Sequence, residues 1–244
     1  WRTAASDSMA AAYRGFDAPG YADSAWLRVT VPHNWDDYGG YRRQLNGNRY
    51  GYAWYRKTFR IPPANRGQRY FLWFEGVGSF ATVWVNGHLA GTHAGGRTSF
   101  TLDVTSYVSV RGENVLCVRA DEPRGIRSLP WVSGGDSPEP GFSEGSQPLG
   151  IFRPVHLIST ARVRVTPFGV HVWNDTTVSA SQATLYLTTR VRNYGSVHGP
   201  KKLEILNLLV DADGSVRARA QSDTVVPGGD AVEVRQVFPG ISRP

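Results

Sequence analysis

Apolar and polar residues alternate along much of the chain, most regularly between positions 54 and 119. An alternation with period two places successive side chains on opposite faces of a β-strand, so that one face is buried and the other meets water. Asn86-Gly87 separates two such segments, and this residue pair strongly favours a type I′ turn between antiparallel strands. The pattern predicts strands at 27–31, 54–61, 69–75, 79–85, 88–90, 98–104 and 114–120, and a returning strand at 150–157.

The pattern of apolar and polar residues changes near residue 160. The remaining stretch, about eighty residues of short alternating segments, is typical of an immunoglobulin-like sandwich, here without a disulfide. Its predicted strands are at 163–165, 170–173, 184–193, 203–210 and 231–237, with a turn at 211–215. The chain therefore divides into two predicted all-β domains, at 1–160 and 161–244.

Two long segments interrupt the alternation. Residues 36–53 are polar and aromatic, and residues 121–149 are rich in Pro, Gly, Ser and acidic side chains. Loops longer than about 15 residues within a compact domain are usually functional or disordered. Near the N-terminus, residues 6–14 are expected to form a short helix capped by Ser6 or Asp7.

Composition excludes several classes of protein. The single Cys117 rules out an internal disulfide framework, and its position in a strand predicts a buried, unreactive thiol. The formal net charge is +7, but the basic residues are scattered singly or in pairs. Nucleic-acid binding requires clustered charge on one face, so no nucleic-acid partner is expected. No apolar run approaches the roughly 18 residues of a transmembrane helix, so no membrane partner is expected either.

The residues offer little for catalysis. The six histidines include no pair with metal-ligand spacing, and neither a nucleophile elbow nor a phosphate-binding glycine loop is present. Acidic residues in the 121–149 segment are candidates for the paired carboxylates of a glycosidase. A loop carboxylate without rigid support is, however, far more often solvated surface than catalyst. We therefore predict no catalytic residue, no metal and no cofactor in this chain.

Four segments, in this order and spacing, resemble the N-terminal half of glycoside hydrolase family 2, which holds β-galactosidases, β-glucuronidases and β-mannosidases. The segments are 31–35 (Val-Pro-His-Asn-Trp), 54–59 (Trp-Tyr-Arg-Lys-Thr-Phe), 74–77 (Phe-Glu-Gly-Val) with 83–87 (Val-Trp-Val-Asn-Gly), and 150–155 (Gly-Ile-Phe-Arg-Pro-Val). The resemblance covers residues 23–160 strongly and 161–244 more loosely.

The resemblance implies a jelly-roll, galactose-binding-like β-sandwich followed by an immunoglobulin-like β-sandwich and then a (β/α)8 barrel. In the family, the barrel carries the glutamates that hydrolyse O-glycosyl bonds. The chain is thus expected to be a non-catalytic part of a β-glycoside hydrolase of carbohydrate metabolism, with the barrel of the same polypeptide as its partner. It begins at Trp1 and is expected to be a trimmed or processed segment. Exported relatives favour a periplasmic or secreted location.

The two long loops carry the candidate sugar-binding residues. Carbohydrates present apolar faces to aromatic rings and hydroxyls to planar polar side chains. The candidates are Tyr41, Asn46, Asn48 and Tyr50 in the first loop and Trp131, Asp136 and Glu144 in the second. The resemblance implies that these loops line the innermost sugar subsite of the barrel, with Glu144 near a substrate-contacting aspartate of β-galactosidases. The alternative is that both loops only pack against the barrel.

A different class of function also fits the pattern. An autonomous carbohydrate-binding or adhesion β-sandwich would bind a glycan without any barrel. Binding of galactosides, glucuronides or mannosides by the isolated chain would favour that class, and turnover of an aryl β-glycoside would contradict a non-catalytic role. The sugar and the oligomeric state are not predicted.

Overall fold

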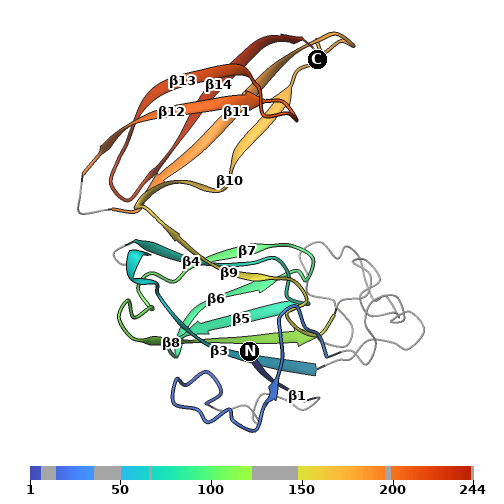
Figure 1. The fold of residues 1–244 in the computed structure, drawn as a ribbon, viewed down its shortest axis with the longest axis vertical. Helices are drawn as coiled ribbons and strands as arrows, with labels where there is room; N and C mark the ends of the chain where they lie inside the picture. The colour runs from blue at the N-terminus through green and yellow to red at the C-terminus, as the bar shows by residue number, and fades with distance from the viewer. Residues whose placement is uncertain (7–14, 36–50, 66–67, 123–147, 196–198, 243–244) are drawn as a thin grey trace. The chain divides into compact units, whose positions relative to one another are not determined.

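A computed structural model describes residues 1–6, 15–35, 51–65, 68–122, 148–195 and 199–242. The chain divides into two compact units, Trp1–Ser159 (unit 1) and Thr160–Pro244 (unit 2). Both are built of β-strands (Figure 1), and the single 3-10 turn η3 (Pro63–Asn65) is the only helical element among the residues described. The predicted all-β fold class is confirmed.

Unit 1 contains a six-stranded antiparallel sheet. Its strands, in spatial order, are β2 (Leu27–Arg28), β1 (Arg2–Ser6), β3 (Gly51–Arg60), β8 (Glu113–Glu122), β5 (Phe80–Val85) and β6 (His88–Ala94). β3 and β8 pair along ten residues and form the centre of the sheet. The two central strands are therefore distant in sequence, as expected for a sandwich rather than a simple chain of hairpins.

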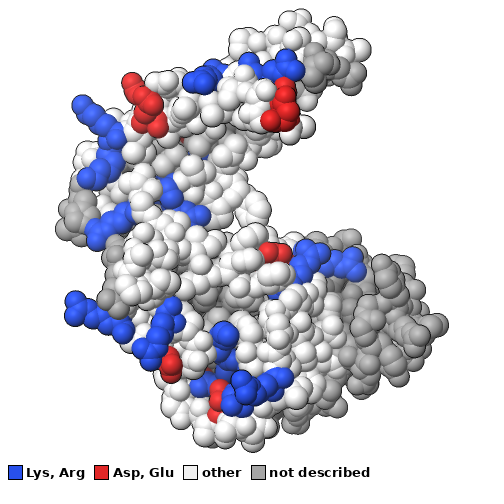
Figure 2. Space-filling view, viewed as in Figure 1, with Lys and Arg blue, Asp and Glu red and all other residues white. Residues whose placement is uncertain are grey.

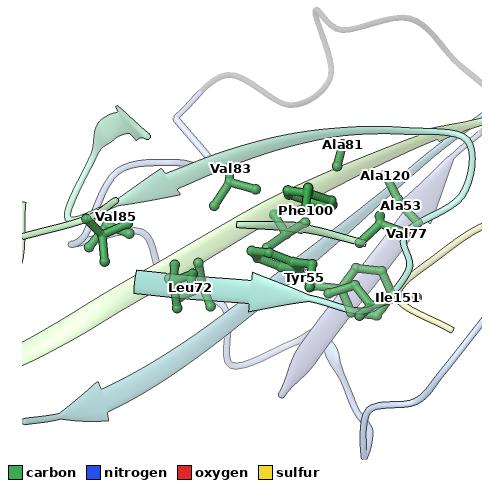
Figure 3. Packing of buried hydrophobic residues seen from close by; sticks show 14 of the residues in the cluster. Ala53, Tyr55, Leu72, Val77, Ala81, Val83, Val85, Phe100, Ala120 and Ile151 are labelled. Atoms are coloured by element: carbon green, nitrogen blue, oxygen red, sulfur yellow. The ribbon is translucent and has the colours of Figure 1, made fainter. Parts of the chain in front are cut away.

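A second sheet, in the order β7 (Phe100–Asp103), β4 (Arg69–Phe74) and β9 (Val155–Thr160), supplies the other layer of this jelly-roll sandwich. The core lies between the two sheets: Tyr55 of β3 and Val83 of β5 pack in one cluster with Leu72 of β4 and Phe100 of β7 (Figure 3). Tyr55 and Val83 are completely buried. Each large side chain removed from water in this way contributes roughly 1.5–3 kcal/mol.

The outer face of β3 is also covered, contrary to the prediction of one buried and one wet face. Trp54 and Arg56 point away from the core cluster, yet they are only 4% and 3% exposed. Phe16 packs edge-on against Trp54 with ring centroids 5.5 Å apart, and its carbonyl accepts a hydrogen bond from Arg56. Asp23 accepts another bond from Arg56 at 3.0 Å. A segment before β3 thus forms a further layer, which period-two alternation cannot reveal.

The predicted turn at Asn86-Gly87 is confirmed. Asn86 and Gly87 have φ angles of 52° and 80° between the paired residues Val85 and His88, as a type I′ turn requires. The Asn86 side chain also donates to Asn114 Oδ1 at 2.8 Å and accepts from the amide of Val115 at 2.8 Å. The turn is therefore tied to β8 as well as to its own hairpin.

Unit 2 is an immunoglobulin-like sandwich, with five strands among its described residues. One sheet has the order β10 (Val163–Asn174), β11 (Gln182–Asn193) and β14 (Ala231–Ser242), and the other pairs β12 (Lys201–Val210) with β13 (Val216–Val226). Asn207 of β12 links the layers, because its amide donates to Thr189 Oγ1 at 2.9 Å and to Gln236 Oε1 at 2.7 Å.

Several predicted boundaries are wrong. Strands β1 and β13 were not predicted, and Ser6, the expected helix cap, closes β1; residues 7–14 lie outside the described part of the chain. The returning strand starts at Val155 rather than at Gly150, since Pro154 has no amide hydrogen to donate. The predicted loops at 36–53 and 121–149 are shorter, because residues 51–53 belong to β3 and residues 121–122 to β8.

Candidate functional site

The two long loops begin and end at the same end of unit 1. The amide of Trp35, where the first loop begins, donates to the carbonyl of Leu149, where the second loop ends, at 2.8 Å. Gly51, where the first loop ends, pairs with Glu122, where the second begins. The four described residues that flank the loops are thus joined in two main-chain pairs.

Three of the four sequence segments singled out above meet at this end. The amide of His33 donates to the carbonyl of Ile151 at 2.7 Å, and His33 Nδ1 lies 2.9 Å from the hydroxyl of Tyr55. A Cβ atom on Gly150 would lie 2.2 Å from that hydroxyl and 2.8 Å from the carbonyl oxygen of His33. Only glycine leaves room for this close approach, which explains a glycine at the start of the fourth segment.

Trp35 connects the start of the first loop to strand β1. Its indole Nε1 donates to Thr3 Oγ1 at 2.9 Å, and the Thr3 hydroxyl donates in turn to the carbonyl of Trp54 at 2.8 Å. Thr3 is completely buried. The chain of two hydrogen bonds leaves this hydroxyl satisfied as both donor and acceptor, as a buried polar group requires.

A buried carboxylate stands where the second loop begins. The Ser79 hydroxyl donates to Glu122 Oε2 at 2.7 Å, and both residues are completely buried. The main chain supports the same junction, because the amide of Ser79 donates to the carbonyl of Asp121 at 2.9 Å and the amide of Gly78 to that of Gly150 at 3.1 Å. The beginning and the end of the second loop are therefore both held by residues 78–79.

A polar and aromatic surface adjoins the loop ends on the outer face of the sheet. Arg119 makes a two-point contact with Asp121, with both N–O distances 2.7 Å. Its guanidinium also lies over the rings of Tyr52 and Trp54, at 5.5 and 5.8 Å from their centroids. Burial raises the pKa of the Asp121 carboxyl, and the hydrogen bonds and charge of Arg119 oppose that shift.

The seven predicted sugar-binding residues, Tyr41, Asn46, Asn48, Tyr50, Trp131, Asp136 and Glu144, lie outside the described residues. The structure therefore tests none of them directly. It adds Tyr52, Arg119 and Ser79, which the sequence analysis missed. Asp121 and Glu122 were expected among the solvated acidic residues of the second loop, but they belong to strand β8, and Glu122 is completely buried. Period-two alternation could have placed the outer-face residues. Tyr52 precedes the buried Ala53, and Arg119 and Asp121 flank the buried Ala120, so all three side chains lie on the face opposite to the core.

The described histidines have structural partners. His156 Nε2 lies 2.7 Å from Glu75 Oε1, and its ring stacks on Trp73 with centroids 4.8 Å apart. His93 stacks on Phe100 at 4.2 Å, and burial lowers its pKa. Among the described residues, no group of three or more His, Cys, Asp or Glu side chains is arranged to hold a metal ion.

Cys117 matches its prediction. It is completely buried, its Sγ lies 3.3 Å from the carbonyl oxygen of Phe16, and burial raises its pKa to about 12. Basic side chains on the face in Figure 2 occur in separate places rather than in one patch. Within the described part of the chain, no helix is both long and apolar enough to cross a membrane.

In a comparison with protein families, residues 8–160 match the sugar binding domain of the glycosyl hydrolases family 2. Among curated proteins, a β-galactosidase of Bacteroides ovatus, BoGH2A, is 30% identical over 242 residues, which is 97% of this chain and 26% of that protein. A β-glucuronidase of Formosa agariphila is 25% identical over 89% of this chain and 23% of its own length. The chain thus spans about a quarter of the curated relatives it matches.

Solved structures show the same fold. The β-glucuronidase of Bacteroides uniformis superposes with a TM-score of 0.80 at 22% identity, over 100% of this chain and 27% of that one. A protein described as a putative β-galactosidase of Bacteroides fragilis superposes with a TM-score of 0.72 at 26% identity, over 90% of this chain and 31% of that one.

Proposed function

The chain belongs to glycosyl hydrolases family 2, and from this membership we propose that it is the non-catalytic N-terminal part of a β-glycoside hydrolase. The catalytic (β/α)8 barrel would lie elsewhere in the same polypeptide. In this proposal, unit 1 and unit 2 brace the barrel, and the two long loops of unit 1 complete its sugar subsite. The length of the relatives supports it, because the matched region is 26% of one and 23% of another.

The meeting of the four loop ends is the observation that carries the subsite proposal. Two separate loops contribute to one binding site only if they leave the fold side by side, and the pairs Trp35–Leu149 and Gly51–Glu122 provide this arrangement. Binding residues commonly lie on loops that a rigid scaffold positions. We therefore propose the seven loop residues as sugar contacts: Tyr41, Asn46, Asn48, Tyr50, Trp131, Asp136 and Glu144.

The described carboxylates near the loop ends support a non-catalytic role. Hydrolysis of a glycoside needs two carboxyl groups facing each other across the sugar, roughly 5–9.5 Å apart. Asp121 and Glu122 are consecutive residues of β8, so their side chains point to opposite faces of the sheet. Asp121 is held by Arg119, and Glu122 is buried beside Ser79. Neither is placed to act with the other on one substrate.

An exposed apolar stripe on unit 2 supports the bracing role. Leu206, Leu208, Val210 and Val216 are each between 42% and 48% exposed. Leu206, Leu208 and Val210 alternate with the inward-facing residues of β12, and Val216 of β13 pairs with Val210. All four side chains therefore lie on the outer face of this sheet. A contiguous apolar strip of this kind marks a surface that packs against another protein part.

Two measurements test the proposal. The isolated 244-residue chain should not hydrolyse aryl β-galactosides, β-glucuronides or β-mannosides, and turnover above a buffer control would overturn the non-catalytic role. In calorimetric titration with the same three sugar classes, the isolated chain should bind none with a Kd below about 1 mM, because the subsite is completed by the barrel. Tighter binding would favour an autonomous carbohydrate-binding module.

A further inference from the structure

The three-stranded sheet of unit 2, formed by β10, β11 and β14 (Figure 1), carries aromatic and basic side chains on its outward face. Leu187, Thr189 and Val191 of β11 are only 2–4% exposed and face the interior of the sandwich. The residues between them point the other way, and residues directly opposite each other in a sheet share a face. The outward face therefore includes Tyr186, Thr188, Arg190 and Arg192 of β11, His171 and Trp173 of β10, and Glu233, Arg235 and Val237 of β14. It is the solvent side of its layer, whatever the number of strands in the opposite layer.

An aromatic row lies at one end of this face. Trp173 and Tyr186 are paired across β10 and β11, and their rings stack with centroids 6.0 Å apart and planes inclined by 20°. The ring of His171 lies 5.2 Å from that of Trp173, and Val237 pairs with Tyr186 on the side away from β10. Trp173 and Val237 are 40% and 43% exposed, so the row is apolar and open to solvent.

Hydrogen bonds fix the position of the aromatic row. The hydroxyl of Tyr186 donates to Asp175 Oδ2 at 2.9 Å, and the amide of Thr177 donates to Asp175 Oδ1 at 2.9 Å. The hydrogen bonds from Thr177 and Tyr186 lower the pKa of the Asp175 carboxyl, so this acceptor stays ionised at neutral pH. A ring that is already held in place loses little conformational entropy when a ligand binds.

Arginine side chains lie at the other end of the face. Arg190 pairs with Glu233, and the neighbouring outward pair is Thr188 with Arg235. The Arg235 side chain is 83% exposed, and its Nε lies 3.8 Å from Glu233 Oε1. Such an exposed ion pair contributes little, so the guanidinium can exchange it for the carboxylate of a ligand. Arg190 and Arg192 are exposed as well, and this end of the face therefore has an excess of positive charge.

We propose that this face binds an acidic oligosaccharide, a chain of sugars that carry carboxylates. The apolar face of one pyranose packs against the row of Trp173 and Tyr186, as sugars do on aromatic rings. The carboxylate of another sugar binds Arg190 or Arg235, because a guanidinium offers two parallel donors to a carboxylate. Charge complementarity selects an acidic chain over a neutral one.

The spacing requires a ligand of several sugars. Tyr186 and Arg190 are four residues apart on β11, which is about 14 Å along a strand and more than one pyranose spans. The site would hold an extended glycan on unit 2, apart from the two long loops of unit 1. It therefore goes beyond the proposed role of those loops and involves no catalytic group.

Calorimetric titration with tetragalacturonate tests this inference. The 244-residue chain should bind this acidic tetramer with a Kd below about 1 mM at low ionic strength. The fully methyl-esterified tetramer has the same chain of rings without charge and should bind at least about tenfold more weakly. The single-sugar glycosides of the earlier test cannot reach both ends of the face and should still bind no more tightly than about 1 mM.

Variants of the face locate the binding. Trp173→Ala should weaken tetragalacturonate binding at least about tenfold, whereas Trp173→Phe, which keeps a ring, should stay within about threefold. The double variant Arg190→Gln with Arg235→Gln should lower the affinity to that of the methyl ester. Arg219→Gln is the matched control, since Arg219 is an exposed arginine of β13 in the opposite layer, and it should leave the affinity unchanged. Circular dichroism checks that each variant folds, and the arginine variants keep the test valid if Trp173→Ala does not.

Several results would overturn the proposal. Equal affinity for the acidic and esterified tetramers would remove the role of charge, and unchanged binding in the double arginine variant would place the ligand elsewhere. Tighter binding of a sulfated tetrasaccharide or of a single-stranded DNA octamer would assign the face to another anion. Loss of binding in the longer polypeptide that the proposed function implies would show that the rest of that chain covers the face. The titration involves no hydrolysis, so its outcome is independent of the proposed hydrolase function.

Discussion

Units 1 and 2 are both sandwiches of alternating strands, but they bury their apolar side chains to different extents. Among the described residues, twenty buried hydrophobic side chains lie in unit 1 and four in unit 2, whereas two of the large exposed ones lie in unit 1 and twelve in unit 2. In unit 1 a sheet of six strands faces a sheet of three, and residues such as Phe16 cover the outer face. In unit 2 three strands face two. Alternation therefore specifies which face of a strand is apolar, but not whether another element covers it.

The difference predicts that the same kind of deletion is costly in one unit and mild in the other. Phe74→Ala removes a completely buried ring from unit 1 and should lower the free energy of unfolding of that unit by about 3–5 kcal/mol. Val172→Ala, at a half-exposed position in unit 2, should cost less than about 1 kcal/mol in the 244-residue chain. Urea unfolding with hydrogen exchange to assign each transition measures both. Similar losses for the two variants would contradict the comparison.

A smaller but still large effect is expected where the loop ends meet. Gly150→Ala introduces a Cβ that would lie 2.2 Å from the Tyr55 hydroxyl, at a residue whose φ is 141°. The clash with fixed backbone and the strained φ should together cost unit 1 about 3 kcal/mol. Gly20→Ala is the control, since a Cβ there meets nothing within 4 Å, and it should change stability by no more than about 0.5 kcal/mol. If the two variants unfold at the same urea concentration, the junction does not depend on close packing at Gly150.

The buried polar pair where the second loop begins should contribute less. Ser79→Ala removes the donor to Glu122 Oε2, and both residues are completely buried. A buried acceptor that loses its donor costs about 1–3 kcal/mol. Ser24→Ala, at an exposed position of the same unit, is the control and should be nearly neutral. Hydrogen exchange of residues 78–79 and 149–151 should also accelerate in Ser79→Ala; unchanged exchange would show that the main-chain bonds alone hold the junction.

The smallest expected effect is a pH dependence in unit 1. Burial lowers the pKa values of His33 and His93, so the folded unit binds fewer protons than the unfolded chain just below the ordinary histidine pKa of about 6.5. The stability that these neutral rings contribute is present above about pH 6.5 and is lost as the pH falls through their lowered pKa values.

Urea midpoints of unit 1 measured from about pH 7.5 to about pH 5 should therefore decrease. His33→Gln should make this decrease shallower, whereas the control His171→Gln, in unit 2, should leave the unit 1 curve unchanged. A slope identical in wild type and His33→Gln would mean that His33 titrates normally.

Particular residues show which structural features could be predicted from the sequence and which could not. Asn86-Gly87 predicted its turn because the required positive φ angles are a local property of those two residues. Cys117 was predicted as buried because alternation is also local. Alternation predicted one wet face for the strand that carries Trp54 and Arg56, and only the packing of Phe16 and Asp23, more than thirty residues away, shows that both faces are covered. Strand β13 was missed because its inward residues before Val226 are Ala218, Ala220, Ser222 and Thr224, which are too small or too polar to produce a clear alternation.

Periodicity and short motifs are properties of neighbouring residues, so they were enough to predict the all-β class, the family resemblance and the two long segments as candidates for binding. The tertiary structure decided what those segments have in common. Trp35 meets Leu149 and Gly51 meets Glu122 through hydrogen bonds and strand pairing across the fold, so both loops leave the sandwich at one place. It also decided that Trp173 and Arg235 lie on one face of unit 2, since the register of β10, β11 and β14 joins residues that are far apart in the sequence.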